Sequence, residues 1–189
     1  MFRRVVGTVE RLAVIALKFD MQVPEIISQS LGKRAMDRAF RAAYEATGNV
    51  HHQQLIPRHF DKKRQDQYRD KPRSKGYAIA KAKIAAKGKA KSADTDRVFT
   101  GLMQQTMTEF ATVRAYPTRY TITMQAPRYM TMRPYKVNQP DKFKEIEAMA
   151  SDDWPVMEGV FQKELERAIE DEEFKLLTRE SKNFRMSGL

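Results

Sequence analysis

Few residues of this chain have the types and spacing that catalysis or metal binding requires. The chain contains no cysteine, which excludes thiolate chemistry, and its three histidines are His51, His52 and His59. On a helix, the adjacent His51 and His52 would point about 100° apart, and Pro57 separates them from His59. We therefore interpret the histidines as a partly exposed cluster near a helix end, and we predict no metal site.

Paired carboxylates are the second group that could do chemistry. They occur at Asp152-Asp153 and in the run from Glu170 to Glu173. General acid–base catalysis needs a carboxyl group whose surroundings shift its pKa. We expect these acids at a helix end and on a polar helix face, so we interpret them as solvated charges.

Phosphate-binding motifs are absent as well. The pattern GxxxxGK[ST] is supplied neither by Gly32-Lys33 nor by Gly88-Lys89, and no GxGxxG follows an expected strand. With no nucleophile–base pair, phosphate loop or metal cluster in the sequence, we predict a protein without enzymatic activity and without a cofactor.

The strongest chemical signal is a concentration of positive charge between Arg58 and Lys91. This segment holds thirteen Lys and Arg against three Asp, a net charge of +10 in a chain whose total is +11. The rest of the chain is nearly neutral, and such asymmetry is typical of proteins that bind an anionic partner. The candidate binding residues are Arg73, Lys75, Lys81, Lys83, Lys87, Lys89 and Lys91.

Two conformations of the basic segment remain open. In an extended chain, the odd-numbered lysines from Lys81 to Lys91 would all lie on one side, with small residues between them. Alanine favours a helix, which would spread the same lysines around its axis. Because like charges repel and apolar residues are few, we expect an extended or loosely ordered arm that becomes ordered on an anionic surface. The simpler interpretation is a solvated basic surface.

The helices that would support this arm follow from hydrophobic periodicity. Residues 34–48 predict an amphipathic helix that ends at Gly48 or continues to Pro57. A short helix is expected over 141–150. The long helix that follows carries an apolar stripe over 156–169, and we expect the stripe to pack on a hairpin.

The hairpin and one further strand complete the expected fold. Alternation of Tyr120, Ile122 and Met124 predicts one hairpin strand, and residues 110–114 predict its partner. Residues 11–19 predict another strand, although a helix competes there. The fold class is therefore α+β: a small antiparallel sheet packed by an N-terminal long helix and a C-terminal helix, with a long basic arm or loop.

The length of the chain suits one domain. We expect the 189 residues to form a single domain with a basic arm at 58–97 and a flexible tail at 182–189. No apolar run approaches the roughly 20 residues that span a bilayer, and charged residues interrupt the apolar N-terminal stretch. We therefore expect neither a signal peptide nor a membrane partner.

Several short motifs follow one another in a distinctive order. LIPRHF (55–60) ends a helix, YRDKPRSKGY (68–77) follows it, and VFTGLM (98–103) precedes the hairpin. After the hairpin comes DKFKEIEAMASDDWPVMEGVFQKELERAI (141–169). This order resembles the neck, or tail-completion, proteins of tailed bacteriophages, and the resemblance spans roughly residues 34–169.

The resemblance implies a non-enzymatic virion protein of the head–tail connector. Such a subunit is assembled in the cytoplasm of the bacterial host and forms a homo-oligomeric ring at the head–tail junction. Its partners would be other copies of itself, adjacent connector or tail proteins, and DNA in the lumen of the ring. The alternative is a cytoplasmic nucleic-acid-binding protein of ribosome-associated type, whose basic arm contacts RNA.

Overall fold

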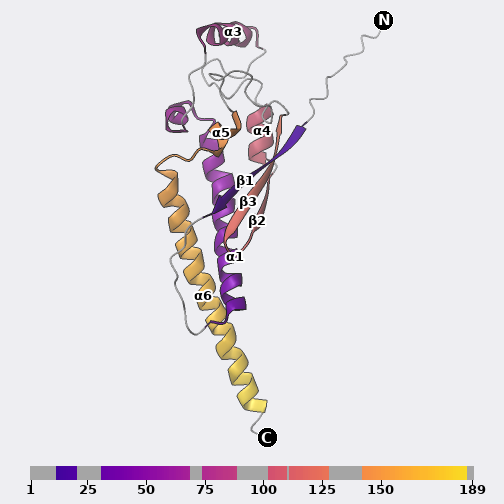
Figure 1. Cartoon of the computed structure of the whole chain (residues 1–189), viewed down its shortest axis with the longest axis vertical. Coiled ribbons are helices and arrows are strands. Elements are labelled where there is room, and N and C mark those ends of the chain that lie inside the picture. Colours follow the sequence, from indigo (N-terminus) through magenta and orange to yellow (C-terminus); the bar gives the residue numbers. More distant parts are fainter. Residues whose placement is uncertain are drawn as a thin grey trace, which may run out of the picture. The chain divides into compact units, whose positions relative to one another are not determined.

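The computed structural model of the chain describes residues 12–20, 31–68, 74–88, 102–109, 111–127 and 142–186 (Figure 1). The described strands are β1 (Leu12–Asp20), β2 (Ala111–Ala115) and β3 (Arg119–Pro127). The described helices are α1 (Lys33–Val50), the π-helical segment η1 (His51–Leu55), α2 (Ile56–Arg58), the 3₁₀ segment η2 (Lys62–Tyr68), α3 (Lys75–Ala86), α4 (Leu102–Glu109), α5 (Lys142–Glu147) and α6 (Asp153–Met186). The α+β class is confirmed, with its small antiparallel sheet, long N-terminal helix and C-terminal helix.

The sheet has the order β1-β3-β2, so β3 is its central strand. The predicted alternation on β3 is confirmed, because Tyr120, Ile122 and Met124 are all buried. Strand β1 is confirmed over the competing helix, and it buries Leu17 and Phe19. β2 and β3 form the expected hairpin, across whose turn the Tyr116 N–H donates to the Arg119 carbonyl at 2.8 Å.

The chain divides into two compact units. Unit 1 comprises Met1–Ala16, Ile56–Ala111 and Thr123–Ala148. Unit 2 comprises Leu17–Leu55, Thr112–Ile122 and Met149–Leu189. Strands β1 and β3 each contribute residues to both units. The single domain over residues 1–189 stays a prediction.

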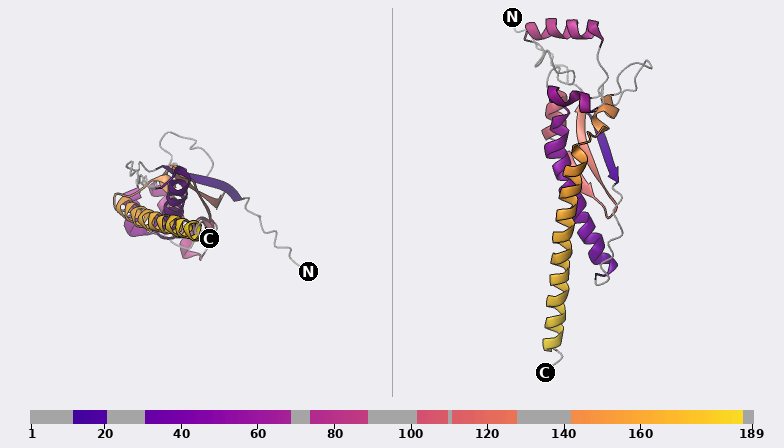
Figure 2. Two further views of the ribbon diagram at one scale, coloured as in Figure 1. Left: turned by 90° about the horizontal axis from the view of Figure 1, so that it is seen from below. Right: turned by 90° about the vertical axis from the view of Figure 1, so that its left-hand side faces the viewer.

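In unit 2, α6 lies alongside α1 in both side views (Figures 1 and 2). The ring of Phe161 packs edge-on against Tyr44 of α1, with 4.8 Å between the ring centroids. We expected the α6 stripe to pack on the hairpin, but Phe161 packs on α1, and Met157 contacts the Tyr120 hydroxyl at 4.0 Å. The physical reason is that α1 buries a row of alanines, which lets the two helices approach closely: Ala35, Ala39 and Ala43.

Helix α1 continues past Gly48 through η1 into α2, so the longer of the two predicted helices is correct. Gly48 therefore does not cap the helix but lies buried within it. An added Cβ at this position would lie 2.6 Å from Val113 Cγ1 and 3.0 Å from Tyr120 Cδ2. Glycine is needed because α1 crosses the hairpin too closely for any side chain.

Gly48→Ala should destabilise the protein by about 1–3 kcal/mol, because overpacking against Val113 and Tyr120 outweighs the higher helix propensity of alanine. The matched control is Gly159→Ala on α6, where no atom lies within 4 Å of the added Cβ. This control should gain about 0.5–1 kcal/mol. Urea unfolding of both variants provides the measurement, and equal stability of the two would refute the close approach.

Unit 1 has a core of its own. The ring of His59 stacks on Tyr68 with 3.8 Å between centroids, and His59 Nδ1 lies 3.2 Å from the carbonyl oxygen of Glu145 on α5. Helix α2 packs against α4. The buried apolar side chains of this unit include Ile56, Phe60, Tyr68, Met103, Met107, Met124, Ala126 and Ile146.

Two predicted irregular segments are more helical than expected. The arm at 58–97 contains the end of α2, all of η2 and all of α3, while residues 69–73 and 89–97 lie outside the described part. Helix α6 continues to Met186, so residues 182–186 are helical rather than part of a tail. Among the described helices, none combines the length and apolar character needed to cross a bilayer.

Candidate functional site

The predicted basic residues differ in how exposed they are to solvent. Lys75 and Lys83 are exposed on α3, and Lys87 is exposed directly after it. Lys81 is buried, so it is not part of a surface that a partner could contact. Arg73, Lys89 and Lys91 lie outside the described residues. The extended arm with one-sided lysines is therefore wrong over Lys75–Ala86, and the helical alternative holds.

Local sequence explains why α3 is a helix. The Ser74 hydroxyl caps its first turn by accepting the Tyr77 N–H at 3.2 Å. Alanine and lysine are good helix formers and supply most of the helix. At the other end, Gly88 adopts a φ of 67°, where glycine is favoured, and its N–H donates to the Ala85 carbonyl at 2.9 Å. These local preferences outweigh the repulsion among the lysines.

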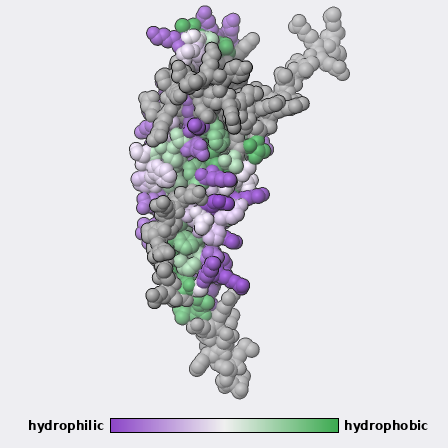
Figure 3. Space-filling view, viewed as in Figure 1, coloured by the Kyte–Doolittle hydropathy of each residue, from purple (hydrophilic) through white to green (hydrophobic). Residues whose placement is uncertain are grey.

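One face of α3 carries a mixed stripe. Lys75, Ile79 and Lys83 recur every four residues and therefore share a face, which we call the α3 stripe. Ile79 is 57% exposed, and Lys81 is the buried residue of the helix. The top of Figure 3 shows hydrophilic and apolar side chains together over α3. A helix of 12 residues with so little burial is marginal by itself, so a partner that covers the stripe would stabilise it.

A second mixed face lies on α6. Its buried side continues from Met157, Phe161 and Leu165 to Glu172. Helical geometry places Glu170, Asp171, Phe174 and Leu177 on the opposite side, which we call the α6 outer face. Phe174 is 71% exposed and Leu177 is 66% exposed. This face lies beyond the stripe predicted over 156–169 and was not among the sequence predictions, although the spacing of Glu170, Phe174 and Leu177 indicates it.

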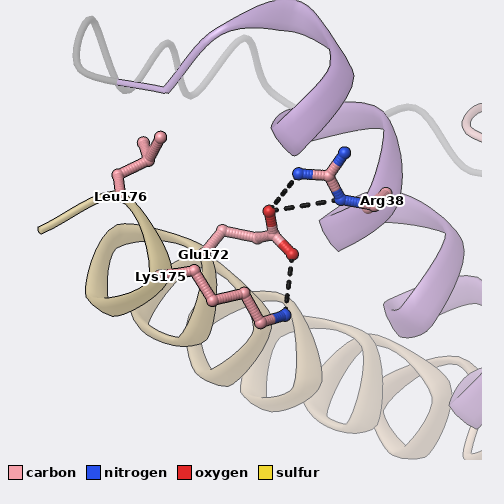
Figure 4. Close-up of a pocket in the computed structure, with 4 residues that line it drawn as sticks. All are labelled: Arg38, Glu172, Lys175 and Leu176. Carbon is pink, nitrogen blue, oxygen red and sulfur yellow. Dashed lines mark hydrogen bonds and ion pairs between the residues drawn. The ribbon is translucent and has the colours of Figure 1, made fainter. Parts of the chain in front are cut away.

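Between the two long helices of unit 2 lies a charged cavity of about 350 Å³, lined by Arg38, Glu172, Lys175 and Leu176 (Figure 4). Arg38 donates through Nε at 3.2 Å and also through Nη2 to Glu172 Oε2. Lys175 Nζ donates to Glu172 Oε1 at 2.9 Å. Both carboxylate oxygens are therefore occupied, and the cluster joins α6 to α1.

The cluster corrects the interpretation of the acidic run. Glu172 was expected to be a solvated charge, but its side chain is buried. The hydrogen bonds from Arg38 and then Lys175 lower the pKa of Glu172 to about 2, and the same pairing raises the pKa of Arg38. A carboxylate held ionised by two cations is not available as a general acid, so we assign the cluster a structural role.

Asp153 was also expected to be solvated, and it too is buried. Its carboxylate accepts the N–H of Ala150 at 3.2 Å, at the start of α6. Trp154, the next residue of α6, is exposed.

Two of the three histidines, His51 and His59, are buried rather than partly exposed, whereas His52 is half-buried. His51 Nδ1 shares a hydrogen bond of 2.9 Å with the Tyr120 hydroxyl, and the His51 ring packs edge-on against Phe19. Burial, followed by the neighbouring His52, lowers the pKa of His51 to about 3. His51 is therefore neutral near pH 7. His59 is buried in the other unit.

Taken over the described ranges, no group of three or more His, Cys, Asp and Glu residues is placed to hold a metal ion. Among the described residues, two exposed faces combine apolar and charged side chains, the α3 stripe and the α6 outer face. Comparisons with protein-family models, with curated proteins and with solved structures find no match for this chain.

Proposed function

We propose that this chain is a structural subunit of the head–tail connector of a tailed bacteriophage, a neck or tail-completion protein that forms a homo-oligomeric ring. The observation that carries the proposal is the exposure of Phe174 and Leu177 side by side on the outer face of α6. Single exposed apolar residues are ordinary, but adjacent large ones that are surrounded by charge mark interaction surfaces.

The charge distribution supports an assembly role. Outside residues 58–91 the chain has a net charge near zero, so copies of it can pack together without strong mutual repulsion. The basic segment then offers a specific contact to an anionic surface, either protein or packaged DNA. The order of motifs that resembles neck proteins supports the same role, and so does a fold of helices packed on a small antiparallel sheet.

The test is deletion of the gene in the virus that encodes this chain. We expect filled heads and free tails to accumulate unjoined, and we expect purified chain to restore joining in extracts. Antibody labelling of complete virions should place the chain at the head–tail junction. As a control for the RNA-binding alternative, RNase treatment should not change how the purified chain assembles.

Two results would contradict the proposal. One is a deletion that yields normal, infectious virions. The other is a chain that is missing from virions and co-purifies with RNA as a monomer, which would favour the cytoplasmic nucleic-acid-binding protein.

A further inference from the structure

We propose that the α3 stripe of one copy docks on the α6 outer face of a second copy of this chain. The inference rests on the proposed ring for its biological setting, and it goes further by naming the two surfaces that meet. The α3 stripe combines one exposed apolar side chain with two positive charges, and the α6 outer face combines two exposed apolar side chains with two negative charges. Ile79 lies between Lys75 and Lys83, and Phe174 and Leu177 lie beside Glu170 and Asp171.

Charge complementarity is the first argument. Residues 75–88 contain lysines and no acid, whereas residues 170–173 are four acids in succession. Within each copy Glu172 is already neutralised by Arg38 and Lys175, but Glu170 and Asp171 are exposed. Lys83 and the C-cap residue Lys87 are four residues apart, so their like charges repel each other at the end of α3. An acidic partner would remove that repulsion.

Matched spacing is the second argument. Ile79 and Lys83 are four residues apart on α3, and Phe174 and Glu170 are four residues apart on α6. Four residues advance a helix by about 6 Å, so antiparallel helices can place Ile79 on Phe174 and Lys83 on Glu170 at the same time. The aliphatic stems of the lysines can cover further apolar surface near Leu177.

A protein surface fits the stripe better than DNA does. Phosphates would satisfy the lysines, but they offer nothing apolar to cover Ile79. The α6 outer face supplies both kinds of contact. Because the two surfaces are different, each copy can use one surface on each neighbour, and repetition of such a contact closes into a ring when the rotation allows.

The experiment is a charge exchange between the two surfaces in the full chain, followed by sedimentation velocity. K75E/K83E alone and E170K/D171K alone should each weaken self-association at least about tenfold, because each places like charges opposite one another. An equimolar mixture of the two variants should associate again, since each then meets the opposite charge on its partner. K33E/R34E, at the exposed start of α1, makes the same change in net charge as K75E/K83E and should associate like the wild type.

Other outcomes overturn the docking. The first is a wild-type chain that stays monomeric at the highest attainable concentration. The second is self-association that neither double variant changes; this would leave the connector ring in place and refute only these surfaces. The third is a mixture that fails to re-associate although circular dichroism shows both variants folded. The fourth is unchanged self-association of K75E/K83E with loss of duplex DNA binding and a salt-dependence slope smaller by about 2, which would make DNA the partner of α3.

Discussion

Phe161→Ala should lower the free energy of unfolding by about 3–5 kcal/mol. The side chain of Phe161 is only 6% exposed, and its ring packs on Tyr44 at 4.8 Å and on Phe40 at 6.5 Å between centroids. Truncation removes the apolar contact between α6 and α1 and leaves a cavity that two long helices cannot easily collapse. Edge-to-face and stacked ring contacts are lost in addition.

The matched control is Phe174→Ala, on the same helix but with 71% of the residue exposed. Its free energy of unfolding should change by no more than about 0.5 kcal/mol. Both variants should be unfolded in urea at a concentration where the chain is monomeric, so that self-association does not contribute. A loss below about 1 kcal/mol at Phe161 would mean that this face of α6 is not buried against α1 in the free subunit.

Acid should destabilise the protein well above the pH at which Glu172 is protonated. The buried His51 has its pKa lowered to about 3 from an ordinary value of 6.5. Between these values the unfolded chain binds a proton that the folded chain does not, so stability falls as the pH falls. From pH 6.5 to pH 4.5 the loss should be about 2–3 kcal/mol. Urea unfolding across this range measures it.

His51→Gln provides the control for this prediction. The variant should be less stable at pH 7, because it loses the hydrogen bond to Tyr120 and the contact with Phe19, but its stability should change less between pH 6.5 and 4.5. Titration of Glu172 contributes little over this range. Its pKa is lowered from 4.5 to about 2, so the stability that its ion pairs provide is lost mainly below pH 4.5. Parallel pH profiles of the variant and the wild type would refute the assignment to His51.

The stability of the protein at alkaline pH depends on Tyr120, the hydrogen-bond partner of His51. Burial raises the pKa of Tyr120 above its ordinary value of 10.0, so the folded protein holds this hydroxyl neutral. The unfolded chain releases the proton first as pH rises, and the stability that the neutral hydroxyl provides is lost above about pH 10. Burial therefore keeps both partners of the hydrogen bond between His51 and Tyr120 uncharged near neutral pH.

Periodicity in the sequence was enough to predict the elements that pack by simple rules. The alternation at Tyr120, Ile122 and Met124 gives a half-buried strand because side chains on a strand point to opposite faces in turn. The amphipathic pattern of residues 34–48 gives α1, and the stripe over 156–169 gives the buried side of α6. These patterns depend on neighbours along the chain.

The burial of charged and polar groups depends on residues far away in sequence. Glu172 is buried because Arg38, 134 residues earlier, pairs with it. His51 is buried because β3 supplies Tyr120, 69 residues later. The residues that flank Glu172 and His51 in the sequence form no pattern that predicts such a distant partner. For α3 the local signals conflicted, since alanine propensity and the Ser74 cap favour a helix, whereas clustered lysines oppose one.

The π-helical segment His51–Leu55 has a consequence for how this chain can change in length. A regular α-helix turns 100° for each residue, so one inserted residue would rotate everything after it. A single π-helical turn accommodates the extra residue instead, so the side chains before and after it keep their directions around the helix axis. Here His51 and Leu55 are both buried, whereas Gln53 and Gln54 between them are exposed. Loss of one of these glutamines would return the turn to an α-helix, so this is where evolution could shorten the helix by one residue.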